Sequence, residues 1–256
     1  MCLLVFSYNC HPIYKFILAA NRDEFYSRPT QPAQFWGENN SIFSGRDVEA
    51  GGTWLGVNKN GRIAALTNYR DIRNMKIEAP SRGIIVSDFL SGKTSADVYA
   101  KKLTESGNKY NGFNLIFGDL NSVFYFNSVS AETKELNSGI YSLSNHLLNS
   151  PWPKSQKINS LFNNVISRKN FSAAGLFEIL TDTEIFEDNL LPDTGLAKEL
   201  ERAVSPIFVV TPAYGTRSSA VVLIDKENNL FFEEHTYDES GKIIQTTGAT
   251  FKIATE

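Results

Sequence analysis

The chain opens with the stretch Met1-Cys2-Leu3-Leu4-Val5-Phe6-Ser7-Tyr8, in which a thiol directly follows the first methionine. An initiator methionine is commonly removed when the next side chain is small, and its removal would leave Cys2 with both a thiol and a free α-amine. An α-amine, with a reference pKa of ~7.7–8.0, can act as a base at neutral pH. Cys2 is therefore a candidate nucleophile that carries its own base, with a structural cysteine in an opening strand as the alternative.

The residues after this stretch predict a hairpin. Residues 3–8 and 13–20 have the pattern of two strands, joined by a turn at residues 9–12. Such a hairpin returns the polar cluster Asn21-Arg22-Asp23-Glu24 to the side of Cys2. We expect Arg22 to lie within reach of the thiol and to favour its thiolate, with a solvated strand end as the alternative.

Composition excludes several classes of protein. The chain has 256 residues, 42% of them hydrophobic, which is enough for a full core, and no linker interrupts residues 1–256, so we expect one domain. The net charge of −3, without a basic stripe, argues against a nucleic-acid surface. Two cysteines, Cys2 and Cys10, indicate a reducing compartment, and the apolar run at residues 2–6 is too short for a signal peptide or membrane span. We expect a cytoplasmic protein without membrane insertion.

A second hairpin is predicted at residues 41–70. Its turn at Asn60-Gly61 is typical of type I′, which needs positive φ at both central positions, and Gly51-Gly52 permits close backbone approach. Asn68 stands at the end of the apolar strand. Its amide could donate to a developing oxyanion or could cap a turn.

The rest of the chain predicts helices covering strands. Helical spacing favours helices at 82–91 and 95–106 and within 154–203. Strands are predicted at 112–118, 123–127, 140–144, 207–211, 219–225, 229–237 and 243–251.

Two further polar residues in this part of the chain are candidate site residues. Asn145 follows a strand and could supply a second oxyanion donor, whereas the neighbouring His146 is interpreted first as structural. Arg217 enters a strand from a glycine-containing loop and could hold a carboxylate, tune the thiol, or form a surface ion pair. The three histidines show no metal-ligand spacing and no cofactor motif occurs, so neither a metal nor a cofactor is predicted.

Taken together, an ordered set of short motifs resembles one family. These are Met1-Cys2, Asn21-Arg22-Asp23-Glu24, Gly51-Gly52-Thr53-Trp54-Leu55-Gly56, Leu66-Thr67-Asn68, Ser81-Arg82-Gly83, Tyr110-Asn111-Gly112-Phe113-Asn114-Leu115, Leu143-Ser144-Asn145 and Tyr214-Gly215-Thr216-Arg217. In this order they resemble the NRDE family, also called the transport and Golgi organisation protein 2 family, from residue 2 to about residue 225. That family is similar to the N-terminal-nucleophile hydrolases, particularly the bile-salt hydrolase and penicillin V acylase group. The resemblance implies an α+β fold, a four-layer αββα sandwich of two antiparallel sheets between helical layers.

The resemblance also implies roles for individual residues. Cys2 would be nucleophile and amine base, Arg22 and Asp23 its tuners, Asn68 and Asn145 oxyanion or positioning groups, and Arg217 the last member of the site. In the hydrolases the arginine and aspartate are usually separated by two residues, whereas here they adjoin. Adjacent strand residues face opposite sides, so Arg22 would share a face with Glu24, and Asp23 would orient the amine or belong to the underlying structure.

Two functions fit this site. The first is an N-terminal cysteine hydrolase that cleaves a C–N bond of a linear amide through a thioester. The alternative, which the family resemblance implies, is a non-catalytic carrier of haem or a lipid-like ligand in the same cleft. Both predict a small-molecule partner and no nucleic acid; the sequence names neither the ligand nor the oligomeric state, and a homo-oligomer is compatible with it.

Overall fold

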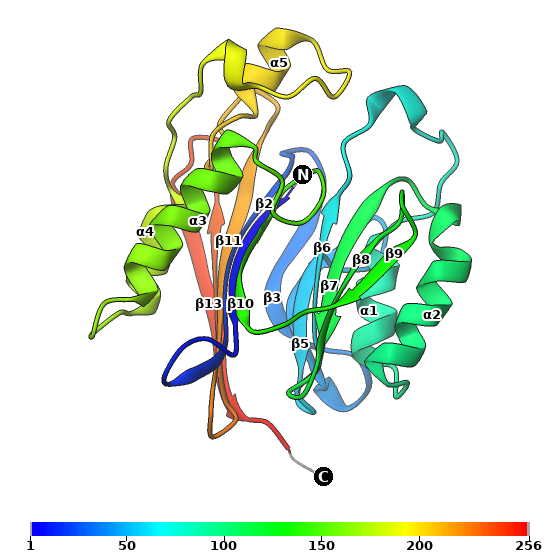
Figure 1. The fold of residues 1–256 in the computed structure, drawn as a ribbon, viewed down its shortest axis with the longest axis vertical. Helices are drawn as coiled ribbons and strands as arrows, with labels where there is room; N and C mark the ends of the chain where they lie inside the picture. The colour runs from blue at the N-terminus through cyan, green and yellow to red at the C-terminus, as the bar shows by residue number, and fades with distance from the viewer. Residues whose placement is uncertain (1, 255–256) are drawn as a thin grey trace.

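The computed structural model describes residues 2–254 and consists of two antiparallel β-sheets that face each other, with helices on the outer face of each (Figure 1). One sheet has six strands in the order β10-β1-β2-β11-β12-β13, and the other has seven in the order β3-β4-β5-β6-β7-β8-β9. The predicted α+β fold, with two sheets between helical layers, is confirmed.

The strands and helices have the following bounds. The six-stranded sheet contains β10 (Gly139–Leu143), β1 (Cys2–Tyr8), β2 (Tyr14–Phe25), β11 (Tyr214–Asp225), β12 (Asn229–Tyr237) and β13 (Ile243–Lys252). The seven-stranded sheet contains β3 (Thr30–Trp36), β4 (Ile42–Asp47), β5 (Leu55–Asn58), β6 (Ile63–Asn68), β7 (Phe113–Gly118), β8 (Val123–Asn127) and β9 (Glu132–Glu135). The helices are α1 (Gly83–Ser91), α2 (Ala96–Ser106), α3 (Pro153–Ile166), α4 (Ala173–Leu180) and α5 (Lys198–Ala203).

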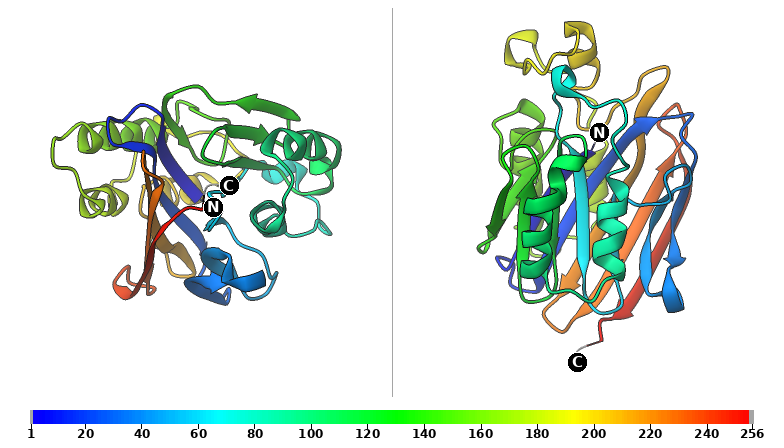
Figure 2. Two further views of the ribbon diagram at one scale, coloured as in Figure 1. Left: turned by 90° about the horizontal axis from the view of Figure 1, so that it is seen from below. Right: turned by 90° about the vertical axis from the view of Figure 1, so that its right-hand side faces the viewer.

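Alternation along the strands produces the layers. On β1, Leu3 and Val5 pack against α3 and α4, whereas Leu4 and Phe6 lie in the core between the two sheets. Cys2 precedes Leu4 by two positions, so its side chain faces the inside of the sandwich. On the other sheet, α1 and α2 lie across the outer face, as Figure 2 shows.

The predicted hairpin at the start of the chain is confirmed. β1 pairs with β2 in the register that places Cys2 opposite Arg22. The polar cluster, however, lies within β2 instead of following it, because its side chains find partners inside the fold: the Asn21 amide donates to the carbonyls of Leu180 (2.8 Å) and Ile207 (2.9 Å).

Two other local predictions are wrong. Of Asn60 and Gly61, only Gly61 has positive φ (83°), and its amide donates to the Asn58 carbonyl (3.1 Å); this is a type I turn followed by a left-handed glycine, not type I′. No strand forms over 207–211, where Val210 makes only an isolated bridge to Gly215. Ile207 belongs to the helix-facing core instead, and an apolar run alone does not distinguish a strand from a buried loop.

The strand that follows is also longer than predicted. β11 begins at Tyr214 rather than at residue 219, so Arg217 lies inside a strand instead of a loop. Within residues 2–254, no helix combines the length and the hydropathy needed to cross a membrane.

Candidate active site

A cavity of about 360 Å³ lies at the Cys2 end of β1. Both sheets and the loop that leads into α1 contribute to its wall. Its charged lining residues are Arg22, Asp23, Glu24, Arg28, Asp47, Glu49 and Arg82. Its uncharged polar lining residues are Cys2, Thr53, Asn68, Ser81 and Asn111. The cavity thus combines a thiol with charged and hydrogen-bonding groups in a predominantly polar wall.

The Cys2 thiol lies in the wall of this cavity and is 8% exposed. Burial raises the pKa of this thiol, the carboxylates of Asp23 and Glu24 raise it further, and the guanidinium of Arg22 opposes the rise. A thiol in this environment needs a base to ionise at neutral pH. Cys2 and Cys10 are both free thiols, and Cys10 is exposed at the other end of β1.

Arg22 is held over the cavity by several weak contacts. Its guanidinium stacks on the Trp54 ring at 4.2 Å, donates to the Thr30 hydroxyl at 3.2 Å and lies 3.9 Å from the Glu24 carboxylate. The contact with Glu24 agrees with the expectation that residues 22 and 24 share a face. The charge of Arg22 therefore stays beside Cys2 without a close ion pair to neutralise it.

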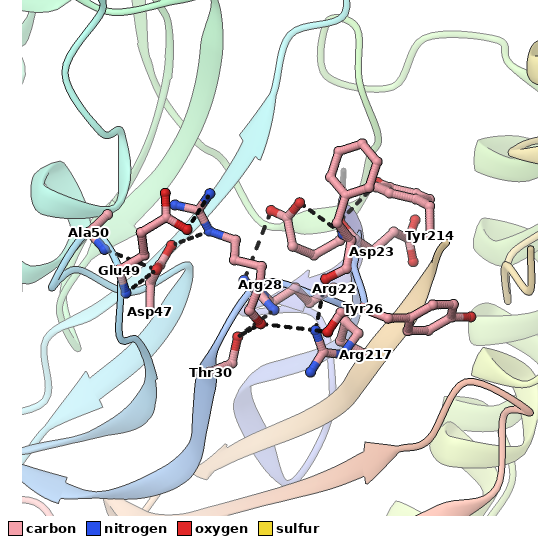
Figure 3. Close-up of polar contacts among 12 residues, drawn as sticks. Arg22, Asp23, Tyr26, Arg28, Thr30, Asp47, Glu49, Ala50, Tyr214 and Arg217 are labelled. Atoms are coloured by element: carbon pink, nitrogen blue, oxygen red, sulfur yellow. Dashed lines mark hydrogen bonds and ion pairs between the residues drawn. The ribbon is translucent and has the colours of Figure 1, made fainter. Parts of the chain in front are cut away.

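Asp23 has a different environment from Arg22. One of its carboxylate oxygens accepts a hydrogen bond from the Thr216 hydroxyl (2.8 Å), and its main-chain carbonyl accepts one from the Tyr214 hydroxyl (2.9 Å). Asp23 is nevertheless among the residues that line the cavity. Figure 3 shows Asp23 and Tyr214 side by side above Arg22.

The two asparagines occupy different places. Asn68 lines the cavity at the end of β6, and no side chain or main-chain group of residues 2–254 hydrogen-bonds its side-chain amide. Asn145 is fully buried beside it: its amide donates to the Asn68 carbonyl (2.9 Å), and its side-chain oxygen accepts from Arg70 (3.2 Å). Asn145 thus supports the backbone of Asn68 and does not line the cavity.

Arg217 is the extra residue of a β-bulge, where the pairing of β11 with β2 shifts between Thr216 and Ser218. Bulges re-aim side chains, and here the guanidinium donates to the carbonyls of Phe25 (2.8 Å), Tyr26 (3.1 Å) and Arg28 (3.1 Å), as Figure 3 shows. It is not among the residues that line the cavity. Arg217 therefore fixes the turn that follows β2.

Sequence reasoning did not single out Arg82, Arg70 or Glu201. Arg82 stands in the motif Ser81-Arg82-Gly83 directly before α1. The sequence feature that could have indicated a functional arginine there is its position before a glycine at a predicted helix start. Arg70 and Glu201 form a buried ion pair of 2.6 Å, and they are separated by 131 positions in the chain. No local pattern reveals that pair.

Glu234 is a buried carboxyl on β12 that lies between the two sheets. It accepts a hydrogen bond from the Ala33 amide of the facing sheet (2.7 Å). Burial raises its pKa to about 7, with the Ala33 amide, Ser218 and Arg22 opposing the rise. At lower pH it is therefore a neutral group that joins the sheets.

Glu234→Gln is expected to remove a pH dependence of stability. Because the folded-state pKa of Glu234 lies above its unfolded value, the native protein holds the proton longer, so its contribution is present at low pH and is lost as pH rises to about 7. Wild type should lose roughly 2–3 kcal/mol of unfolding free energy, relative to the variant, between about pH 5 and about pH 8. Urea unfolding at both pH values measures this, and parallel curves would contradict the assignment.

Within residues 2–254, no three His, Cys, Asp or Glu side chains gather in a way that could hold a metal ion.

Comparison with solved structures supports the fold. An N-acylethanolamine-hydrolyzing acid amidase ortholog from Caenorhabditis elegans aligns with a TM-score of 0.50 at 12% identity, covering 87% of this chain and 92% of that one. The C2A mutant of a conjugated bile acid hydrolase from Clostridium perfringens aligns with a TM-score of 0.46 at 12% identity, covering 97% and 92%. At this identity the first alignment concerns the fold alone.

Comparison of sequences identifies the family. The family described as Transport and Golgi organisation 2 matches residues 1–239. The human Transport and Golgi organization protein 2 homolog is 37% identical over 261 residues, covering 92% of this chain and 93% of the relative. The resemblance found in the short motifs is confirmed, and the chain belongs to the Transport and Golgi organisation 2 family.

Proposed function

We propose that this protein is an N-terminal cysteine hydrolase that cleaves a linear amide. The observation that carries the proposal is the position of Cys2: its thiol lines a polar cavity of about 360 Å³ and is paired across the strands with Arg22. Removal of Met1, which lies outside the described residues, would give Cys2 the α-amine that the mechanism needs.

The reaction would proceed in two balanced steps. In the first, the α-amine takes the thiol proton, the sulfur attacks the amide carbon, and the C–N bond breaks as the ammonium returns the proton to the leaving amine. A thioester remains on Cys2. In the second, the same amine takes a proton from water, hydroxide attacks the thioester, and the carboxylic acid leaves as the thiol is restored.

Each residue around Cys2 would stabilise or orient a different charged group of the reaction. Arg22 stabilises the thiolate, while the carboxylate of Asp23 orients the α-ammonium of the mature chain. Asn68 lines the same cavity, and its side-chain amide would donate to the oxyanion. Asn145 would act indirectly, by holding the main chain at Asn68.

The lining of the cavity favours this function over a haem or lipid carrier. Seven of its lining residues are charged. Trp54 and Leu66 are its large apolar lining residues, and the other apolar ones are small. Haem and acyl chains are bound mostly by apolar and aromatic walls. A small polar amide fits this wall better.

Intact mass spectrometry tests the proposal. After incubation with a thiol-reactive lactone, we expect a mass that lacks Met1 and carries one adduct, located on Cys2 by peptide mapping. Cys10 is the internal control, because it is more exposed than Cys2 and would be the preferred target of unassisted alkylation. Retained Met1, or labelling of Cys10 alone, would count against the hydrolase; a saturable haem absorbance change would then favour the carrier.

A further inference from the structure

We propose that the amide substrate carries a carboxylate and that Arg82 binds it. This inference deepens the proposed hydrolase function and rests on it. Arg82 comes from the seven-stranded side of the cavity, immediately before α1, whereas Cys2 and Arg22 come from the six-stranded side. A substrate in the cavity would therefore meet a cation on the wall contributed by the other sheet.

The contacts of Arg82 leave most of its donors for a ligand. Its guanidinium donates one hydrogen bond, to the Gly112 carbonyl at 3.1 Å. No carboxylate of residues 2–254 lies within ion-pair distance of it. A guanidinium has several N–H donors in a planar fork that matches a carboxylate with two parallel hydrogen bonds.

The other two arginines of the cavity each lie near an acid of the protein, Arg28 closely and Arg22 at a longer distance. Arg28 lies 2.8 Å from Asp47 and 3.7 Å from Glu49, as Figure 3 shows, and Arg22 faces Glu24 at 3.9 Å. Arg22 also stacks on Trp54 and lies beside Cys2, so Arg82 is the cavity arginine that has neither an acidic partner nor a place beside the thiol. Burial lowers the pKa of Arg82, while Cys2 and Glu24 oppose that shift. Arg82 and Cys2 line the same cavity.

Close backbone packing holds Arg82 at this place. A Cβ atom on Gly52 would come within 2.3 Å of the Gly83 carbonyl carbon, and the Thr53 amide donates to the Gly83 oxygen at 3.2 Å. Only glycine at position 52 permits the start of α1 to lie against this loop. The main chain next to Arg82 is thus held in place by its contact with residues 52 and 53. A residue that selects a substrate needs such a fixed position.

The carboxylate could stand on either side of the scissile bond. On the amine side, the substrate would be an N-acyl amino acid; on the acyl side, it would be a dicarboxylic acid monoamide. Both present the same anion to Arg82, and hydrolysis assays with each class distinguish them.

The experiment compares charged and neutral substrates on matched variants. Wild type, Arg82→Gln, Arg82→Lys and Arg73→Gln are assayed with N-acyl glycines, their methyl esters, dicarboxylic acid monoamides, and amides of a diamine that carry a positive charge. Arg73 is the control, because it is 66% exposed, pairs with Asp193 and does not line the cavity. Thermal unfolding of each variant checks that it folds.

The expected result is selective. Loss of one charge-assisted contact should lower kcat/KM of Arg82→Gln by roughly 10- to 100-fold for carboxylate substrates, mostly through KM, and leave the methyl esters unchanged. Arg82→Lys should recover part of the activity, and Arg73→Gln should match wild type. Equal losses on acids and esters, or a preference for the cationic amides, would overturn the role of Arg82 while leaving the hydrolase intact. Failure of wild type to hydrolyse any of the amides would overturn both.

Discussion

Cys2→Ala is expected to abolish amide hydrolysis, lowering kcat by roughly 10⁴- to 10⁶-fold, as removal of a covalent nucleophile does in other hydrolases. Alanine is also small, so Met1 should still be removed and the α-amine should remain. What disappears is the sulfur that attacks the carbonyl. Since the substitution removes one buried atom beside an open cavity, the unfolding free energy should change by only about 1 kcal/mol.

Two controls separate the thiol from the amine. Cys10→Ala removes the exposed thiol and should leave turnover at the wild-type level. An extra glutamate inserted between Met1 and Cys2 keeps the thiol but prevents methionine removal, and it should be as inactive as Cys2→Ala. Turnover by stopped assay with product quantified by mass spectrometry measures all three. Full activity of the inserted variant would show that the α-amine is not the base.

The parts of this site that could be predicted from sequence are those encoded locally. Apolar runs with a short turn predict a β1–β2 hairpin that returns the polar cluster to the side of Cys2, and in the structure Cys2 pairs with Arg22. Strand alternation likewise predicts that Arg22 shares a face with Glu24. The layered α+β fold is predicted by the resemblance to a family, because periodicity alone does not determine how two sheets face each other.

The parts that could not be predicted depend on contacts between distant segments. The bulge at Arg217 arises where β11 pairs with β2, about 190 positions away in the chain. Asn145 and Asn68 look alike in sequence, each at a strand end, yet one is buried under the other. The need for glycine at position 52 is evident only from its contact with Gly83 in the folded chain, and this contact positions Arg82.

Arg70→Met is expected to lower the unfolding free energy by about 3–5 kcal/mol, because it leaves the Glu201 carboxylate buried without its partner. Arg70 and Glu201 are each 4% exposed and lie 2.6 Å apart, and Glu201 also accepts a hydrogen bond from the Thr194 hydroxyl. The pair joins α5 to the end of β6. Urea unfolding of wild type and variant at equal m-values measures the difference.

The ion pair of Arg73 with Asp193 is a matched control. It has a similar N–O distance, 2.8 Å, but its side chains are 66% and 77% exposed, so Arg73→Gln should cost at most about 1 kcal/mol. The double substitution Arg70→Met with Glu201→Leu should recover most of the stability, since neither member of the pair is then left as a buried charge without its partner. Equal costs for Arg70→Met and Arg73→Gln would contradict the buried-charge explanation.

The same substitution should reach the active site through Asn145. The Arg70 guanidinium donates to the Asn145 side-chain oxygen at 3.2 Å, its main-chain amide donates to the Asn145 carbonyl at 2.7 Å, and Asn145 in turn donates to the Asn68 carbonyl. If Asn68 supplies the oxyanion donor, the double variant should remain folded but have a lower kcat. The fall in kcat should exceed any rise in KM and approach the roughly 10²-fold loss that a misplaced oxyanion donor causes. A double variant with wild-type kcat would show that the Asn145 contacts from the main chain suffice to position Asn68, and that Arg70 serves stability alone.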